Sequence, residues 1–277
     1  MYAFALLATA VLMFSTSDAA FSQGPSRAPV AKTLVALLAH PDDEAPVAPI
    51  LARYAREGVQ VYLIIASNGD QGAGQQGHIQ RPDSTSPGED LARARAKEAR
   101  CATEALGVHP PILLGFPDGK LGDYAGDRSL IFRLTQRIAE ELQRLHPDVV
   151  VTWGPDGGVA HPDHRIVSNI ATQLQRAEAP GVPERLFYMY LPAETIRAMN
   201  PQRGVLPFVI PVARYFTVHV PFAPQDLEAA KRSMLCHRTQ FTAEAAQRIL
   251  PATERAWNGE VALIPAFAMP ASRDLFR

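Results

Sequence analysis

An apolar run over residues 33–38 passes almost directly into the charged segment 40–44, with the sequence His-Pro-Asp-Asp-Glu. Six mostly apolar residues rich in Leu and Val are typical of a buried strand, and the charged segment has the features of a helix start. The sequence therefore predicts one imidazole and three carboxylates at the C-terminal end of a strand. Backbone groups alone cannot compensate so many titratable side chains, so we expect a counter-ion there, most simply a metal ion.

The alternation of strand and helix patterns indicates an α/β fold. A helix that has Pro46 and Pro49 near its start and runs through 50–57 follows the first strand, and a strand over 59–66 comes next. This order predicts parallel strands joined by a right-handed crossover. We expect a single domain over 33–277 with a Rossmann-like three-layer fold and a mainly parallel sheet. The other predicted elements are helices over 89–106, 129–145, 163–177 and 225–236, and strands over 112–114, 149–153, 185–190 and, at an edge, 216–220. The segment after residue 240 has no clear pattern.

Two more histidines follow the predicted strand 149–153, in the segment 161–164 with the sequence His-Pro-Asp-His. The carboxyl ends of parallel strands share one edge of a sheet, so both charged segments are expected at that edge. Catalytic zinc takes three ligands from histidine and carboxylate side chains and keeps a fourth position for water. We infer that one of Asp42 and Asp43 binds the metal while the other faces the water. One histidine of the second segment can bind metal, and the other can reach a substrate.

Simpler interpretations exist for single features. Each charged segment alone would fit a capped, solvated helix start, and only their shared edge favours a metal site. Glu44 could either orient His40 or favour the helix N-terminus. The Gly-rich stretch 69–77 lacks a phosphate-binding pattern and is interpreted as part of a lid near the substrate. Four histidines without partners at ligand spacing are expected on the surface or in the core: His78, His109, His146 and His219.

The two charged segments together resemble the zinc-dependent de-N-acetylases of the PIG-L / LmbE-like family. The resemblance covers roughly residues 34–240, with further segments in the family's order at 95–98 (Arg-Ala-Lys-Glu), 114–119 (Leu-Gly-Phe-Pro-Asp-Gly) and 231–240, which ends in His-Arg-Thr-Gln. Two positions depart from the family pattern. The aromatic residue that often stands two positions before His161 is absent, and Asp70 stands where many members have glutamate. Both departures bear on substrate preference, because neither touches the metal ligands.

The resemblance implies a role for most residues of the two segments. Asp42 corresponds to the family's general base, which takes a proton from the metal-activated water. His161 corresponds to the histidine that stabilises the oxyanion or protonates the leaving amine, and amide hydrolysis needs both kinds of group. Three residues correspond to the metal ligands: His40, Asp43 and His164.

The activity implied is that of a metal-dependent N-deacetylase that removes an N-acetyl group from an N-acetylglucosamine-type sugar or glycoconjugate. One catalytic Zn²⁺ is expected, and Fe²⁺ also fits two histidines and one aspartate. Contacts to this substrate are expected from Arg95, Asp118 and His237. Two alternatives stay open: a zinc amidase of the same family acting on a non-sugar amide, and a non-catalytic exported sugar-binding protein.

The N-terminal residues have the pattern of an export signal. Residues 2–14 are an apolar segment that is too short to span a bilayer but fits the core of a signal peptide. We expect a signal peptide over 1–22, a flexible mature N-terminus over 23–32, and a periplasmic or secreted protein without a stable membrane span after processing. An uncleaved N-terminal membrane anchor is the alternative.

Charge and cysteine content narrow the remaining possibilities. The net charge of −1, with dispersed basic residues, gives no footprint for nucleic acid. Cys101 and Cys236 are the two cysteines; they could form one disulfide in an oxidising compartment or stay as buried thiols. Both are interpreted as structural.

Overall fold

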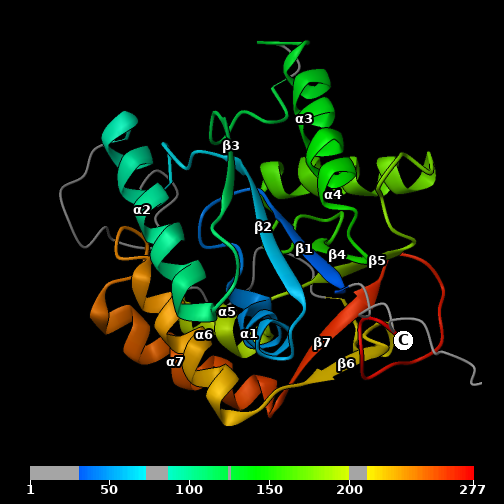
Figure 1. Ribbon diagram of the computed structural model, residues 1–277. Helices are drawn as coiled ribbons and strands as arrows, with labels where there is room; N and C mark the ends of the chain where they lie inside the picture. Colours follow the sequence, from blue (N-terminus) through cyan, green and yellow to red (C-terminus); the bar gives the residue numbers. More distant parts are fainter. Residues whose placement is uncertain (1–30, 73–86, 124–125, 200–210) are drawn as a thin grey trace, which may run out of the picture. The chain divides into compact units, whose positions relative to one another are not determined.

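The computed structural model describes residues 31–72, 87–123, 126–199 and 211–277 (Figure 1). The predicted signal peptide and most of the Gly-rich stretch 69–77 lie outside these ranges. Residues Ala31–Arg277 form one folded unit. A search of the described residues for a helix both long and apolar enough to cross a membrane finds none.

Seven strands of this unit form one sheet in the order β3-β2-β1-β4-β5-β7-β6. The first five in this order are parallel, β7 runs antiparallel to β5, and β6 runs antiparallel to β7. The strands are β1 (Thr33–Leu38), β2 (Gln60–Ser67), β3 (Ile112–Phe116), β4 (Val149–Trp153), β5 (Arg185–Met189), β6 (Val218–Pro221) and β7 (Glu260–Pro265). The predictions of a mainly parallel sheet and of an edge strand near residue 218 are confirmed.

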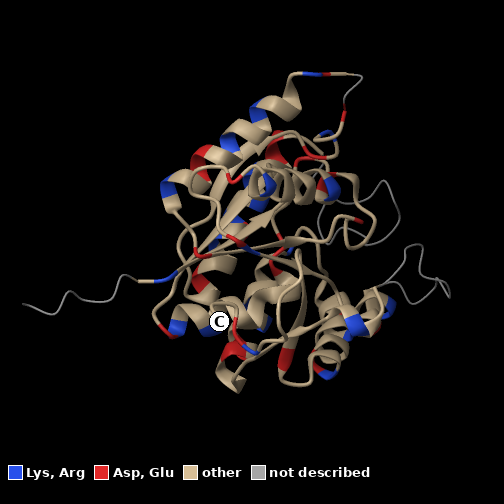
Figure 2. Cartoon of the chain, turned by 90° about the vertical axis from the view of Figure 1, so that its right-hand side faces the viewer, with Lys and Arg blue, Asp and Glu red and all other residues tan. Residues whose placement is uncertain are grey.

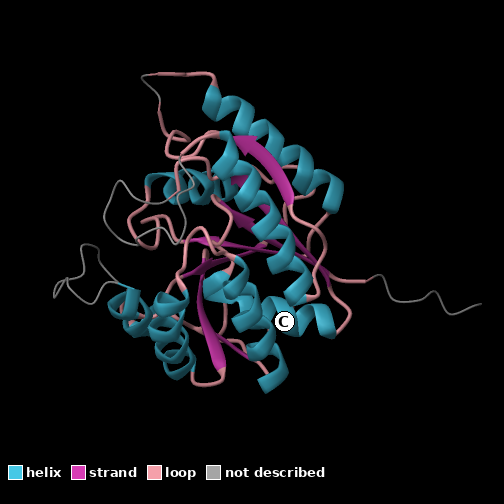
Figure 3. Ribbon diagram, turned by 90° about the vertical axis from the view of Figure 1, so that its left-hand side faces the viewer, coloured by secondary structure: helices cyan, strands magenta, loops and turns pink. Residues whose placement is uncertain are grey.

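Helices cover both faces of the sheet, which confirms the three-layer prediction (Figures 1 and 3). Val35 and Leu37 of β1 pack with α3 (Leu130–Leu145) and α4 (Pro162–Arg176) on one face. Leu34 and Ala36 point to the other face, since side chains alternate along a strand. That face carries α1 (Ala48–Arg56), α2 (Glu89–Leu106), α6 (Pro224–Cys236) and α7 (Ala243–Trp257). The remaining short helices are η1 (Ala45–Val47), α5 (Ala193–Met199) and η2 (Ala213–Tyr215).

The strands β1 and β4 are neighbours in the middle of the sheet although more than a hundred residues separate them. Leu34 pairs with Val149 in the parallel register. The chain then leaves β1 toward α1 on one face, whereas it leaves β4 toward α4 on the other. Loops that diverge in this way leave a crevice at the strand ends, the usual place for a ligand in an open α/β sheet. Segments 40–44 and 161–164 both begin there.

The C-terminal third contains elements that the sequence analysis did not predict: α5, α7 and β7. Pro251 lies inside α7, and proline inside a helix weakens the sequence signal for it. Helix α7 packs against both α5 and α6. The helix expected to carry Pro46 and Pro49 near its start is divided into the 3-10 turn η1 and helix α1, with one of these prolines in the first turn of each.

The two cysteines form a disulfide that joins α2 to α6. The Cα atoms of Cys101 and Cys236 lie 5.7 Å apart, and 135 residues separate the two in sequence. The choice that the sequence left open between a disulfide and two free thiols is therefore settled in favour of the disulfide.

Basic residues (blue) and acidic residues (red) are interspersed along the described helices (Figure 2). Many pair with a neighbour one turn away, for example Arg53 with Glu57 and Arg137 with Glu140. This mixed pattern agrees with the net charge of −1.

Candidate metal and catalytic site

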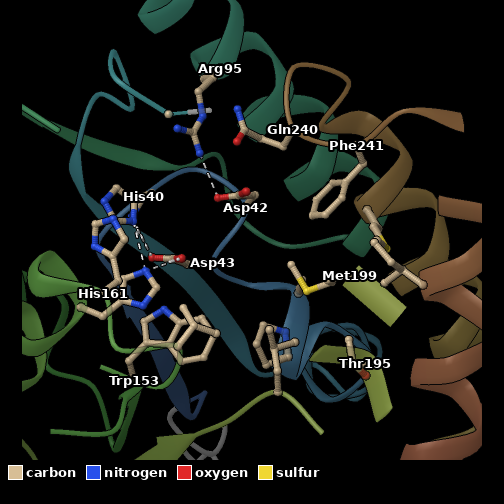
Figure 4. A pocket seen from close by; sticks show the side chains of 18 of the residues that line it. His40, Asp42, Asp43, Arg95, Trp153, His161, Thr195, Met199, Gln240 and Phe241 are labelled. Carbon is tan, nitrogen blue, oxygen red and sulfur yellow. Dashed lines mark hydrogen bonds and ion pairs between the residues drawn. The ribbon is translucent and has the colours of Figure 1, made fainter. Parts of the chain in front are cut away.

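The charged segments 40–44 and 161–164 meet in a pocket of about 660 Å³ at the switch point between β1 and β4 (Figure 4). A volume of this size is typical of small-molecule sites. The structure brings seven of the eight predicted site residues to the pocket wall: His40, Asp42, Asp43, Arg95, Asp118, His161 and His164. The eighth, His237, does not line it.

Three donor atoms of the predicted metal ligands face one another. His40 Nδ1 lies 3.1 Å from His164 Nε2, which lies 3.0 Å from Asp43 Oδ1. The other ring nitrogen of His164 contacts the Gly157 carbonyl at 3.0 Å, so Nε2 is left for the metal. The second carboxylate oxygen of Asp43 accepts hydrogen bonds from the backbone N–H groups of Ala39 and His40, at 2.9 and 2.8 Å. These contacts fix the orientation of the ligands before any ion binds.

The spacing and the charge of this cluster both fit a cation. Donor atoms about 2.0–2.1 Å from a tetrahedral zinc lie roughly 3.3 Å from one another, close to the separations observed here. Burial alone would lower the pKa of His40, but the carboxylates of Asp43, Asp118 and Asp163 raise it well above its ordinary value. The surroundings of His40 therefore favour positive charge, which a bound metal ion would supply.

Asp163 is a site residue that the sequence analysis missed. It is fully buried, and its Oδ2 lies 3.3 Å from His40 Nε2. The backbone N–H groups of Gly119 and Leu121 donate to the two Asp163 oxygens at 2.7 and 3.1 Å. A carboxylate that holds the far nitrogen of a ligating histidine sets the orientation of its ring. The available signal was its place between the two histidines of segment 161–164.

Asp42 differs from its neighbour Asp43 in backbone and in surroundings. Its φ of +99° is rare for a residue with a side chain, and such strain occurs where a site fixes a side chain in one direction. Burial raises the pKa of Asp42 to about 6, although Arg95 lowers it; Asp43 adds to the increase. By contrast, the pKa of Asp43 lies well below its ordinary value, because His164 and His40 outweigh the effect of burial. One carboxyl group is thus suited to exchange a proton and the other to stay ionised.

Arg95 holds the carboxylate of Asp42 in place. Its Nη2 lies 2.9 Å from Asp42 Oδ1 and also donates to the Pro41 carbonyl, while Nη1 donates to the Gly69 carbonyl at 3.1 Å. Gly69 has a φ of +69°, and a Cβ there would lie within 2.8 Å of the guanidinium, so only glycine lets the loop approach so closely. The described start of the Gly-rich stretch therefore packs over Arg95.

The orientation of His161 assigns its protons. Its Nδ1 accepts a hydrogen bond from the Asp163 N–H at 3.2 Å, as an N-cap of α4, so the neutral ring carries its proton on Nε2. Burial, together with the nearby His40 and His164, lowers the pKa of His161 to about 4. At neutral pH this side chain is a neutral N–H donor at the pocket wall.

Asp118 reaches the pocket but its two oxygens are engaged. Oδ1 lies 3.1 Å from His40 Nε2, and Oδ2 accepts a hydrogen bond from the Gln71 N–H at 3.2 Å. Burial opposes ionisation, but His40 and Arg95 lower the pKa of Asp118 to about 2. The loop after β3, which carries Asp118, is thereby tied to the ligand His40.

His237 and Glu44 pair with each other behind the pocket, contrary to expectation. The His237 side chain is 0% exposed, and its Nε2 lies 2.7 Å from Glu44 Oε1, which also accepts from Ser233 Oγ at 2.9 Å. His237 is not placed to make the substrate contact expected of it, because no part of its side chain is accessible. Glu44 does not orient His40, and instead joins the turn η1 to the end of α6.

Trp153 at the end of β4 also supports the site. Its indole stacks on the His164 ring, with centroids 4.6 Å apart and an interplanar angle of 4°. Among the described residues its buried Nε1 has no hydrogen-bond partner. The stacked indole restricts the His164 ring to the plane in which it faces Asp43.

Comparison with a family model shows a match over residues 35–175, to PIG-L, described as GlcNAc-PI de-N-acetylase. A relative from Actinosynnema mirum, a 1D-myo-inositol 2-acetamido-2-deoxy-alpha-D-glucopyranoside deacetylase, is 31% identical over 234 residues, which cover 76% of this chain and 81% of the relative. The family match spans both charged segments, most of β1, and the parallel strands β2, β3 and β4. It ends before the fifth parallel strand, β5.

Two solved structures show the same fold at low sequence identity. The N,N'-diacetylchitobiose deacetylase from Pyrococcus horikoshii has a TM-score of 0.58 and 17% identity, over 87% of this chain and 85% of its own. The 4-carboxy-2-hydroxymuconate hydratase from Pseudomonas putida KT2440 has a TM-score of 0.56 and 15% identity, over 86% and 97%. A deacetylase and a hydratase share this fold, so the fold alone does not determine the reaction, which depends on the residues of the site.

Proposed function

The chain belongs to the PIG-L family of de-N-acetylases, and from that premise we propose that it hydrolyses the N-acetyl group of an N-acetylglucosamine-type sugar or glycoconjugate. The observation that carries the proposal is the opposed state of two adjacent carboxyl groups. Asp43 faces two imidazole nitrogens and stays ionised, whereas the adjacent Asp42 has a pKa of about 6 and pairs with Arg95. A ligand and a general base next to each other are what metal-assisted amide hydrolysis needs.

We propose Zn²⁺ as the ion that His40, Asp43 and His164 hold. Two imidazoles and one carboxylate, with one position left over, are a donor set that catalytic zinc uses, and Fe²⁺ is the competing ion. When bound, zinc lowers the pKa of a water molecule to about 7 and polarises a carbonyl group.

The remaining roles follow from the protons that each side chain can hold. Asp42 accepts a proton from the attacking water, and Arg95 keeps its carboxylate directed into the pocket. His161 presents an Nε2–H donor, which suits a developing oxyanion. Because its pKa is about 4, His161 protonates a leaving amine only with a proton relayed to it during the reaction.

The substrate proposal is supported by the polar wall beside the metal donors. Gln71, Asp118 and Lys120 line this part of the pocket, on the loops after β2 and β3. The amide group of Gln71 and the ammonium group of Lys120 can bind sugar hydroxyls, whereas Asp118 is engaged with His40 and the Gln71 backbone.

Acetate release from a panel of N-acetylated sugars and non-sugar amides, measured with zinc-loaded protein, tests the proposal. Hydrolysis of N-acetylglucosamine glycosides at a rate that Asp42→Asn reduces at least a hundredfold would support it. Hydrolysis confined to non-sugar amides would favour the amidase alternative. Binding of sugars without any acetate release would favour a non-catalytic protein.

We further propose that the protein is exported. The apolar segment 2–14 and the small residues after it support a signal peptide, and the disulfide between Cys101 and Cys236 supports an oxidising compartment. Cell fractionation with N-terminal sequencing of the mature protein tests this. A first residue close to position 23 is expected, whereas an intact N-terminus in the membrane fraction would indicate an anchor.

A further inference from the structure

The pocket continues beyond the metal donors into a second part with a different lining. In Figure 4, His40, Asp43 and His161 lie at one end, Met199 and Phe241 at the other, and Asp42 between them. We call the second part the apolar arm; its walls come from α5, α6, α7 and the loop before α7. Six side chains define it: Met199, Ala230, Met234, Phe241, Ile249 and Leu250.

Most polar side chains near the arm are paired within the protein, and Gln240 Nε2, beside Phe241, donates to Thr239 Oγ1 at 3.0 Å. Thr195 Oγ1 donates to Thr253 Oγ1 at 2.9 Å, and Thr253 Oγ1 donates to the Ile249 carbonyl at 2.9 Å. Lys231 pairs with Glu228 and Glu254, both at 2.9 Å. A ligand in the arm therefore gains hydrophobic contact and little hydrogen bonding, which excludes a second sugar ring as its natural occupant.

The arm and the polar wall lie toward opposite faces of the sheet. Helices α6 and α7 belong to one face, whereas His161 starts α4 on the other. The polar wall is on the α4 side, because the Gly119 and Leu121 N–H groups donate to Asp163 in the first turn of α4. The metal donors lie between the two, where the scissile amide must sit. An amide placed there directs its amine portion and its acyl portion toward opposite parts of the pocket.

We propose that the apolar arm binds the hydrocarbon chain of an N-acyl group longer than acetyl, so that the protein is a deacylase of N-acylated amino sugars. This rests on the proposed function. If the amine portion of the substrate is a sugar, it binds at the polar wall, and the acyl portion then lies in the arm. The reaction is unchanged: the amide C–N bond breaks, the water oxygen bonds to the acyl carbon, and the amine receives a proton. Two of the six arm residues are methionines, whose flexible side chains adapt to chains of different length.

A chain-length series tests the inference. Zinc-loaded protein is given methyl glucosaminides with N-acyl groups from acetyl to decanoyl, and amine release is measured. The kcat/KM is expected to rise about threefold for each added methylene until the arm is filled. The dissociation constants of straight-chain carboxylic acids, measured by calorimetry, are expected to fall in the same order. A kcat/KM that declines from acetyl onward overturns this inference alone, whereas no hydrolysis at any length overturns the proposed function with it.

A matched series places the hydrocarbon on the other side of the amide. N-acetylglucosaminides with aglycones from methyl to decyl are expected to show no comparable rise in kcat/KM. A rise with the aglycone and none with the acyl chain would overturn the assignment of the acyl group to the arm.

Substitutions that fill the arm provide an independent check. Ala230→Leu and Met199→Trp are each expected to lower the ratio of decanoyl to acetyl kcat/KM at least tenfold. The matched control is Leu235→Phe, because Leu235 lies on the same helix α6 but is 50% exposed and outside the pocket lining. An unchanged ratio in both arm variants, with circular dichroism showing that they fold, would contradict the inference.

Discussion

Two consecutive residues with the same chemical group have different tasks in this site. The backbone at Asp42, with φ at +99°, turns its carboxyl group away from that of Asp43. Asp43 then receives two backbone hydrogen bonds and faces His164, while Asp42 meets Arg95. A one-atom change in either side chain is therefore expected to remove a different function.

Asp42→Asn should lower kcat at least a hundredfold, because an amide cannot accept a proton from water at neutral pH. Metal content, measured by elemental analysis, should stay at the level of the unsubstituted protein, since Asp42 is not one of the three donors. A rate within threefold of the unsubstituted protein would remove Asp42 from the role of base.

Arg95→Gln should move the acidic limb of the pH–rate profile to higher pH. The pKa of Asp42 is about 6 because burial raises it more than Arg95 lowers it, and the base works only when deprotonated. Loss of the guanidinium removes the lowering contribution, so a shift of about one pH unit is expected. The measurement is kcat/KM from pH 4.5 to 8.5 with metal in excess; an acidic limb that stays in place would show that Arg95 acts on structure alone.

At the scale of elements, contacts from α6 to α2 and η1 hold the wall of the pocket. The disulfide between Cys101 and Cys236 joins α2 to α6, and Glu98 of α2 accepts hydrogen bonds from both the backbone and the hydroxyl group of Thr239, just after α6. Helix α6 is thus tied to the part of the chain that carries the metal ligands.

Reduction of the disulfide should destabilise the protein without changing its fold. A crosslink between residues 135 apart restricts the unfolded chain strongly, and its loss is expected to cost about 2–5 kcal/mol of unfolding free energy. Denaturant unfolding with and without dithiothreitol measures this. The double variant Cys101→Ala/Cys236→Ala is the control, and its stability should not respond to the reductant.

The buried pair of Glu44 and His237 should make stability depend on pH. Burial disfavours the charged form of both groups, but the interaction between them outweighs this effect. The pKa of His237 is therefore raised above its ordinary 6.5, and that of Glu44 is lowered below its ordinary 4.5. The contribution of His237 is complete below pH 6.5 and is lost as pH rises through the raised value; that of Glu44 is complete above pH 4.5 and is lost as pH falls through the lowered value.

Glu44→Gln should therefore lower the Tm most between pH 4.5 and 6.5, where the intact pair contributes fully. Melting curves of both proteins across pH 3.5–9 check this, and the difference should narrow toward both ends. A difference that is the same at every pH would mean that the pair is not ionised.

The sequence predicts the elements up to α4 well because each strand there is a mainly apolar run and the helices have recognisable start or stop signals. It predicts the metal donors for the same reason, since both charged segments follow such strands. The elements α5, α7 and β7 were missed, because α7 carries a proline and β7 reverses the direction of the sheet. The partner of His237 could not be predicted either, because 193 residues separate it from Glu44.

At the scale of the whole folded unit, the residues before α5 and the C-terminal third of the chain contribute different parts of the pocket. Residues before α5 supply the metal donors, the base and the polar wall, and α5 to α7 supply the apolar arm. Short-range patterns predicted the first group. The arm has no such pattern, because it forms only where the helices α5, α6 and α7 meet in the folded protein.

Removal of the metal should lower the stability of the whole unit, because the ligands come from segments 40–44 and 161–164 on opposite sides of the switch point. An ion at 100 times its dissociation constant adds about 2.7 kcal/mol to the free energy of unfolding. The Tm with zinc and after dialysis against a chelator measures this. His164→Ala should abolish the response to zinc, and a response that persists would place the ion elsewhere.

The position of β7 between β5 and β6 has a consequence for synthesis on the ribosome. Among the described residues β6 pairs along its length only with β7 and bridges to Ser272, and both follow it in the chain. The strand that leads into α6 can therefore join the sheet only after β7 and Ser272 have been synthesised. The strands β1 to β5 pair with one another, and among them β5 also pairs with the later β7. A nascent chain would thus acquire the proposed metal ligands first, and the helices that line the apolar arm would dock fully only after residues 260–272 have been synthesised.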